Sequence, residues 1–331
     1  MRKHDPFIRV RCPEERTLRF DMIQPASAIP ELGLGIDAGG TQTRWALAAP
    51  GGAILAEGTV AGLSALQMGT PHGRDAVRAT FAELAAAVLL NGTPRRVQAG
   101  LTGFGGDSEQ LQRWLAELLH VPAAGIRFCS DMEIAYRASF APGEGYLVYA
   151  GTGSIGAFID VDGTFHRAGG RGVVLDDGGG GFWIAREALR HIWRLEDEEP
   201  GAWRASKMAQ AVFDYVGGDD WAYSRQFIYG QERGAVGKLA LAVAATADQD
   251  PAAAAILQNA GGELARLAQA LIKRFGPRLV AVSGRAAELH PSIVAAMRAL
   301  LPADLAFRQT AGGAHYAAAR MALEQPAAPA A

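Results

Sequence analysis

The fold of this chain is best predicted from Gly35-Ile36-Asp37-Ala38-Gly39-Gly40-Thr41, in which apolar residues lead into a run of glycines. The strand pattern Arg44-Trp45-Ala46-Leu47-Ala48 follows, and a turn at Pro50-Gly51-Gly52 leads to a third short strand pattern. The segment therefore predicts two successive hairpins, the first of which turns on glycines.

The same pattern returns about 110 residues later along the chain. Tyr146-Leu147-Val148-Tyr149 leads into Gly151-Thr152-Gly153-Ser154, and a strand pattern over 156–161 ends at the turn Asp162-Gly163. Two unrelated hairpins are a common occurrence. The similar chemistry of the two glycine turns nevertheless favours duplication of one strand–turn–strand unit.

Segments with helical spacing of apolar residues fill the intervals between these strand patterns. Alternating strands and helices indicate an α/β fold. The stretches 196–199 and 217–220 are predicted to be solvated loops. Helices are expected at 73–90, around Leu111–Leu118, at 132–140, 182–195, 203–215, 234–246, 251–274, 291–300 and 313–323, with further strands at 279–282 and 305–307.

Length and composition point to two domains and to no nucleic-acid or membrane partner. The chain has 331 residues, about twice a typical domain, and 49% of them are hydrophobic, which is ample for two cores. Its net charge of -2 comes from interspersed acids and bases. No apolar run is long enough for a membrane span, and the charged N-terminus lacks a signal-peptide core, so a cytoplasmic protein is expected.

The glycine patterns argue against two common nucleotide-binding folds. Gly151–Gly156 fits the dinucleotide-binding pattern G-x-G-x-x-G, and 33–38 fits its alanine-ended variant. That fingerprint requires a helix directly after the glycines, whereas a strand pattern follows here. The string Gly234-Ala235-Val236-Gly237-Lys238 lacks the spacing and the hydroxyl residue of a P-loop.

Two facing glycine turns offer another way to hold phosphates, because amides without a Cβ nearby can approach an anion closely. The hydroxyls of Thr41, Thr152 and Ser154 can add donors. A carboxylate at the edge of such a turn, here Asp37, suits a phosphate only with a cation between them, which suggests Mg²⁺. The simpler alternative is that tight hairpins need glycine. The amides concerned are those of Gly39, Gly40, Thr41, Gly151, Thr152 and Gly153.

Taken in order, these motifs resemble a known superfamily. Gly35–Thr43 resembles the phosphate-1 motif of the sugar kinase/Hsp70/actin superfamily, and Gly151–Ser154 resembles its phosphate-2 motif. Within it, the chain is similar to the branch that joins N-acetylglucosamine kinases with BadF/BadG-type ATPases. The resemblance covers roughly 32–324 and includes Ser130-Asp131, the glycine-rich stretch 169–181, and the adenosine-side turns Val282–Ala286 and Gly312–Ala314.

The resemblance implies an architecture of two duplicated ribonuclease H-like domains of the actin-like ATPase type. ATP and a sugar would bind in the cleft between them. The first domain would comprise 32–145 with the C-terminal helix 313–324, and the second 146–312. Residues 1–31 would form an N-terminal extension, and a homodimer is expected on the same ground.

The resemblance also implies roles for individual residues. Asp131 would be the general base that accepts the proton of the attacking sugar hydroxyl, although an Asp before a helix is also an ordinary N-cap. Asp177 would bind the sugar; a surface-loop carboxylate is the alternative. ATP would contact Asp37 (through Mg²⁺), Gly39, Gly40, Thr41, Gly151, Thr152, Gly153, Gly284, Gly312 and Gly313, and the sugar would contact Ser64, Asp131, Ser154, Gly170, Arg171 and Asp177.

Departures from the family pattern bear on the substrate and on the alternatives. Leu66 stands where N-acetylglucosamine kinases carry a sugar-binding Asn, and Leu cannot hydrogen-bond sugar hydroxyls, so glucosamine or another amino sugar is expected as an alternative to N-acetylglucosamine. The resemblance implies phosphorylation at the 6-OH. A BadF-type ATPase that activates a partner enzyme is the first alternative. The resemblance implies that such ATPases are homodimers that share an iron–sulfur cluster held by two cysteines per chain in the second half. Here Cys12 lies in the extension and Cys129 is expected at a buried strand end, which disfavours this alternative. The second alternative is a nucleotide-dependent regulator that binds sugar without turnover.

Overall fold

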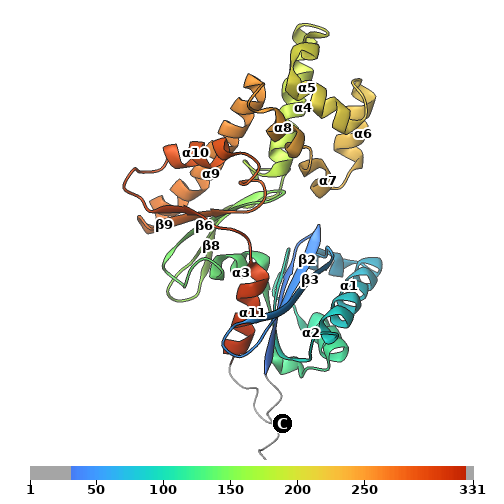
Figure 1. Cartoon of the computed structure of the whole chain (residues 1–331), viewed down its shortest axis with the longest axis vertical. Coiled ribbons are helices and arrows are strands. Elements are labelled where there is room, and N and C mark those ends of the chain that lie inside the picture. The colour runs from blue at the N-terminus through green and yellow to red at the C-terminus, as the bar shows by residue number, and fades with distance from the viewer. Residues whose placement is uncertain (1–30, 326–331) are drawn as a thin grey trace, which may run out of the picture. The chain divides into compact units, whose positions relative to one another are not determined.

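The computed structural model describes residues 31–325, so nearly all of the predicted N-terminal extension lies outside the described residues. The described part contains two five-stranded sheets flanked by helices (Figure 1). In the first sheet the strand order is β3-β2-β1-β4-β5. Its strands are β1 (Leu32–Ala38), β2 (Gln42–Ala48), β3 (Ile54–Ala61), β4 (Pro94–Leu101) and β5 (Ile126–Ser130).

The second sheet repeats the topology of the first. Its order, β8-β7-β6-β9-β10, places an antiparallel meander on one side of β6 and two parallel strands on the other, as β2, β3, β4 and β5 lie around β1. This correspondence confirms the predicted duplication and the α/β class. Its strands are β6 (Gly145–Ala150), β7 (Ser154–Ile159), β8 (Phe165–Gly169), β9 (Leu279–Ser283) and β10 (Phe307–Gln309).

Helices fill the intervals between the strands. Among those of residues 31–325, none combines the length and the apolar character that crossing a bilayer requires. The α-helices are α1 (Pro71–Leu89), α2 (Glu109–Leu119), α3 (Asp131–Arg137), α4 (Gly181–Glu198), α5 (Lys207–Val216), α6 (Trp221–Gly230), α7 (Arg233–Gly237), α8 (Ala240–Thr246), α9 (Pro251–Phe275), α10 (Pro291–Ala299) and α11 (Ala314–Glu324), and the 3₁₀ helices are η1 (Ala65–Gly69), η2 (Ala123–Gly125) and η3 (Ala202–Ala205).

Four helical predictions differ from the structure. The predicted helix 203–215 is divided into η3 and α5, because Ser206 ends the first and caps the second. The helix α4 continues to Glu198, through the stretch predicted as a loop, because no helix-breaking residue precedes Pro200. The helix α6 is absent from the prediction, although Asp220 caps it by accepting hydrogen bonds from its first amides. The predicted helix 234–246 is divided into α7 and α8 around Lys238.

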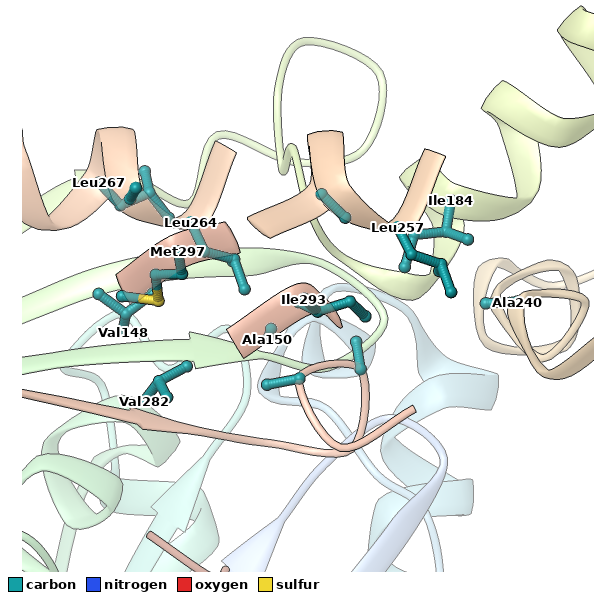
Figure 2. Close-up of a cluster of buried hydrophobic side chains, with 14 of the residues drawn as sticks. Val148, Ala150, Ile184, Ala240, Leu257, Leu264, Leu267, Val282, Ile293 and Met297 are labelled. Carbon is teal, nitrogen blue, oxygen red and sulfur yellow. The ribbon is translucent and has the colours of Figure 1, made fainter. Parts of the chain in front are cut away.

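The core of the second half forms between its sheet and the long helix α9. Figure 2 shows Leu264 and Leu267 of α9 beside Met297 of α10, above Val148 of β6 and Val282 of β9. All five side chains are buried. Apolar residues spaced along α9 thus cover one face of the second sheet, and this packing holds the end of β6, where the second glycine turn begins.

The last helix, α11, packs on the first sheet although it follows the whole second half in sequence. Figure 1 shows α11, coloured red, against the blue strands, and it contacts β1, β2 and β4. A Cβ at Gly35 would lie under 3.0 Å from the backbone of His315 and Ala319, so only glycine permits this approach. The domain boundaries 32–145 and 146–312 stay predictions, and this packing supports grouping α11 with the first domain.

We expect Gly35→Ala to destabilise the fold by about 1–3 kcal/mol or more, because the methyl group would push α11 off β1. The matched control is Gly230→Ala. A Cβ at Gly230, the last residue of α6, meets nothing within 4 Å, so that variant should be neutral or slightly stabilised. Thermal and urea unfolding measure both variants. Equal midpoints for the two would contradict the proposed close contact.

Candidate active site

A cleft of about 1650 Å³ is lined by both glycine turns. The turn between β1 and β2 contributes one wall, and the turn between β6 and β7 contributes another. Of the predicted site residues, Arg171 does not line this cleft; its side chain is exposed. The cleft lining includes the other predicted residues: Asp37, Gly39, Gly40, Thr41, Ser64, Asp131, Gly151, Thr152, Gly153, Ser154, Gly170, Asp177, Gly284, Gly312 and Gly313.

Each glycine turn uses its first amide to close itself. The amide of Gly39 donates to the carbonyl of Gln42 at 3.1 Å, and the amide of Gly151 donates to the carbonyl of Gly153 at 2.8 Å. These two amides are therefore unavailable to a phosphate, and the set of amides predicted to bind phosphate loses Gly39 and Gly151. No acceptor within residues 31–325 is recorded for the next two amides of each turn: Gly40, Thr41, Thr152 and Gly153.

The N-terminus of α4 holds the second turn from behind. The amides of Gly181 and Phe182 donate to the carbonyls of Gly151 and Thr152, both at 2.9 Å. A Cβ at Gly180 would lie under 3.0 Å from the backbone of the turn, so glycine permits this contact. The positive end of the helix dipole thus lies against the turn, which favours an anion on its far side.

Asp131 is the first residue of α3, but it does not cap that helix. The N-cap is Ser130, whose Oγ accepts a hydrogen bond from the amide of Glu133 at 3.1 Å. The alternative explanation of Asp131 as a cap is therefore wrong. Its carboxylate accepts hydrogen bonds from the Thr102 hydroxyl and from the amide of Met132, the latter at 2.9 Å. Burial raises the pKa of Asp131, and these hydrogen bonds lower it.

Asp37 lies near Asp131 at the end of β1. Its pKa is raised to about 6, first by burial and then by the negative charge of Asp131, while Arg44 acts in the opposite direction. The effect of one charge on the other shows that the two carboxylates share one region of the cleft. Each is easier to ionise with a cation between them.

The carboxylates of this region suit a cation that is held jointly with a substrate. No group of three or more His, Cys, Asp or Glu side chains within the described residues could enclose a metal by itself. Mg²⁺ is commonly held by one or two carboxylates together with phosphate oxygens and water. Asp37, beside a turn with free amides, fits that donor set.

Asp177 is buried beside the second turn, so it is not the surface-loop carboxylate of the alternative explanation. It is 8% exposed, and its carboxylate accepts a hydrogen bond from the amide of Gly172 at 3.0 Å. A Cβ at Gly153 would collide with that carboxylate. The φ of Asp177 is +58°, a strained value for a residue with a side chain. The glycine-rich loop therefore holds Asp177 against the turn between β6 and β7 (Gly151–Gly153), which we call the phosphate-2 turn.

Two of the predicted sugar-binding hydroxyls are engaged by the protein itself. Ser64 donates to the carbonyl of Thr102 at 3.0 Å and accepts from the amide of Leu66. Ser154 is buried and donates to the carbonyl of Gly178 at 2.6 Å. Both hydroxyls hold loops of the cleft in place, and their one hydrogen-bond donor is used.

Several cleft residues escape the sequence analysis. Thr102 follows β4, the parallel neighbour of β5, and this pairing brings it to Asp131. The sequence signal that could have identified Thr102 is its position directly after an apolar strand, where site residues often lie. Residues of the segment 232–238, predicted only to begin a helix and to lack the spacing of a P-loop, also line the cleft: Glu232, Arg233, Gly234, Ala235 and Lys238. Further lining residues absent from the prediction are Arg44, Glu57, Tyr149, Arg285, His315 and Tyr316.

Comparison with known proteins adds independent findings. The N-acetyl-D-glucosamine kinase of Dictyostelium discoideum is 25% identical over 265 residues, which make up 74% of this chain and 81% of the relative. A Chromobacterium violaceum protein proposed to be an N-acetylglucosamine kinase has a solved structure with a TM-score of 0.65 and 25% identity, covering 88% of this chain and 99% of that one.

The fold extends to more distant sugar kinases. A ROK family glucokinase from Streptomyces griseus, solved with glucose and AMPPNP, gives a TM-score of 0.55 at 18% identity, covering 89% of this chain and all of the other. At that identity the likeness concerns the fold alone. The BadF/BadG/BcrA/BcrD ATPase family matches residues 34–301, most of the described chain. The chain therefore belongs to the BadF/BadG/BcrA/BcrD ATPase family.

Proposed function

We propose that this chain is an ATP-dependent kinase that transfers a phosphoryl group to the 6-OH of an amino sugar, N-acetylglucosamine or glucosamine. One observation carries the proposal. The carboxylate of Asp131 does not serve as the N-cap of α3, and it lines the same cleft as two glycine turns whose amides include some without a hydrogen-bond acceptor in the described residues. The likeness to N-acetylglucosamine kinases in sequence and in structure supports it.

Asp131 would act as the general base. A sugar hydroxyl has a pKa far above 7, so a carboxylate must accept its proton as the oxygen attacks the γ-phosphorus. The Thr102 hydroxyl and the Met132 amide fix the carboxylate by donating to it. Its raised pKa brings the carboxylate nearer to the basicity that proton transfer at neutral pH requires.

The glycine turns would hold the polyphosphate. The amides of Gly40 and Thr41 on one turn and of Thr152 and Gly153 on the other can donate to phosphate oxygens, whose charge changes during transfer. Asp37 would hold Mg²⁺, which supplies positive charge that offsets the charge of the phosphates. Because these donors are fixed by the fold, little reorganisation is needed at the moment of reaction.

The sugar would lie between Asp131 and Asp177. The carboxylate of Asp177 is held at the cleft by the amide of Gly172 and can accept hydrogen bonds from sugar hydroxyls with its second oxygen. Leu66 also lines the cleft and is 75% exposed, so it offers an apolar surface where an Asn would offer hydrogen bonds. The proposed substrate is therefore either glucosamine or N-acetylglucosamine. We also propose a homodimer, and this part of the proposal rests on the family likeness alone.

An ATPase that activates a partner enzyme is the second candidate, and family membership favours it. In such an ATPase, an iron–sulfur cluster shared between two chains would need accessible cysteine thiolates as ligands. Cys129 is buried in β5, its pKa is raised to about 12 mainly by burial, and its sulfur accepts a hydrogen bond from Gln98. Cys12 lies outside the described residues. Cys129 is therefore a poor ligand, which favours the kinase.

The function is tested by Mg²⁺-dependent ADP release across glucosamine, N-acetylglucosamine, N-acetylmannosamine, N-acetylmuramic acid and glucose. A rate stimulated by one amino sugar, with the phosphorylated sugar identified by mass spectrometry, is the expected result. ATP hydrolysis that is indifferent to every sugar would overturn the kinase and favour the ATPase.

We expect Asp131→Asn to lower kcat by about 10²–10⁴-fold, because the proton acceptor is lost while the shape of the site is kept. Affinities for ATP and sugar, measured by calorimetry, should change little. The matched control is Glu133→Gln on the same helix, which removes an acid paired with Arg137 and should retain near-normal turnover. An Asp131→Asn rate within about tenfold of the wild type would exclude the role of base.

Asp37→Asn is expected to raise the melting temperature of the nucleotide-free protein. In the folded state the pKa of Asp37 is about 6 against 3.8 for the unconstrained group, so its ionised form destabilises the fold above pH 6, by about 3 kcal/mol. The gain from Asn should therefore be largest near pH 8 and fall by about half at pH 5, where the wild-type carboxyl is mostly protonated.

Mg²⁺ provides the second readout for the same variant. If Asp37 holds the ion, Mg²⁺ with ADP should raise the melting temperature of the wild type more than Mg²⁺-free ADP does, and this difference should vanish in Asp37→Asn. Differential scanning fluorimetry at both pH values measures both effects. An Asp37→Asn protein that gains as much from Mg²⁺ as the wild type would contradict the assignment.

A further inference from the structure

We propose that Arg233 and Lys238, at the two ends of α7, bind the β- and γ-phosphates of ATP, an inference that rests on the proposed ATP-dependent reaction. The sequence predicts a helix over 234–246 and excludes a P-loop, but it assigns no ligand to these residues. In the structure the same residues line the cleft, together with Gly234 between them. We call 232–238 the α7 segment; it belongs to the helical region between β8 and β9.

The α7 segment lies against both phosphate turns. A Cβ placed on Gly234 would be 2.9 Å from Oγ1 of Thr41, in the turn between β1 and β2. A Cβ on Gly237 would be 3.5 Å from Cγ2 of Thr152, in the turn between β6 and β7. Two glycines three residues apart lie on one side of a helix. That side of α7 therefore faces the place where a polyphosphate would lie between the turns.

Buried side chains hold the α7 segment in this position. Val236 and Leu239 are fully buried in the core of the second half, and α7 packs against α4. The helix α4 in turn holds the phosphate-2 turn through its first amides. The segment and the turn are thus fixed to one helix, so the position of the α7 backbone relative to the turn is set by packing.

The two cations have no acidic partner. Neither Arg233 nor Lys238 forms an ion pair or a side-chain hydrogen bond with any residue of 31–325. Burial raises the pKa of Asp177, and the charge of Arg233 acts weakly in the opposite direction, which is consistent with a guanidinium on the Asp177 side of the cleft. Both side chains are exposed to the cleft and free to meet an anion.

The rest of the cleft creates a need for such cations. Asp37, Asp131 and Asp177 all line it and would repel a polyphosphate, and the glycine turns offer amide dipoles. Two other cations, Arg44 and Arg285, also line the cleft, and the charge of Arg44 acts on Asp37. An ammonium and a guanidinium on the remaining wall offset that repulsion and form charge-assisted hydrogen bonds with phosphate oxygens. The competing explanation is that Arg233 and Lys238 are solvated surface charges without a ligand.

The test compares nucleotides that differ only in phosphate number. Affinities of the full chain for a non-hydrolysable ATP analogue, ADP, AMP and adenosine are measured by calorimetry with Mg²⁺ at fixed salt. We expect Lys238→Met and Arg233→Met each to lower the affinity for the ATP analogue by about tenfold or more and the affinity for ADP by less. The affinities for AMP and adenosine should stay within about twofold of the wild type. Lys238→Arg should restore most of the affinity.

Lys273→Met on α9 is the matched control, because Lys273 is exposed and does not line the cleft; it should bind every nucleotide like the wild type. Melting temperatures confirm that the variants are folded. If the wild type binds the ATP analogue and both α7 variants match it, the inference fails while the proposed function stands. If the wild type binds no nucleotide, the proposed function fails and the inference fails with it.

Discussion

The orientation of the two glycine turns rests on hydrogen bonds to their carbonyl groups. The carbonyl of Gly39 accepts from the amide of Leu63 at 3.1 Å, and that of Gly151 accepts from the amide of Gly181 at 2.9 Å. With the carbonyls bound from behind, amides of both turns are left for the cleft. Close approach requires glycine next to each donor: a Cβ at Gly62, like one at Gly180, would collide with its turn. The same solution occurs in both halves of the chain.

The carboxylates that suit the cleft for chemistry also destabilise it. Burial raises the pKa of Asp37, Asp131 and Asp177, which means that the fold disfavours the ionised form of each carboxyl. Hydrogen bonds from Thr102 and from the amides of Met132 and Gly172 offset part of that penalty. Bound cations would offset the rest. The site therefore lowers the stability of the protein without ligands, and binding of substrates and cations would restore it.

The duplicated fold was predictable because it depends on short-range patterns, whereas much of the site depends on long-range packing. Glycine turns between apolar runs are visible in the sequence, and their repetition predicted two equivalent sheets. The role of Thr102 follows from the parallel pairing of β4 with β5, which no local pattern specifies. Arg171 is exposed and does not line the cleft, although Gly170 and Gly172 on either side of it do, and no local pattern distinguishes the three residues. The α7 segment reaches the turns only through the packing of α4.

The two halves share a topology, but their equivalent strand ends carry different residues. One residue before the end of the central strand, the first half has Asp37 where the second has Tyr149. Directly after the outermost parallel strand, the first half has Asp131 and the second has Thr310. Since both acidic strand ends belong to one half, the proposed base and metal ligand lie together, on the first sheet.

The second half differs in its connections as well. Between its third and fourth strands, β8 and β9, it carries α4 to α9, whereas the first half carries only η1 and α1 between β3 and β4. That added region supplies the helix that holds the phosphate-2 turn and the cations of α7. The two halves therefore share two glycine turns, and in the proposed function they would contribute different groups: carboxylates from the first half, and cations for the polyphosphate from the helices of the second.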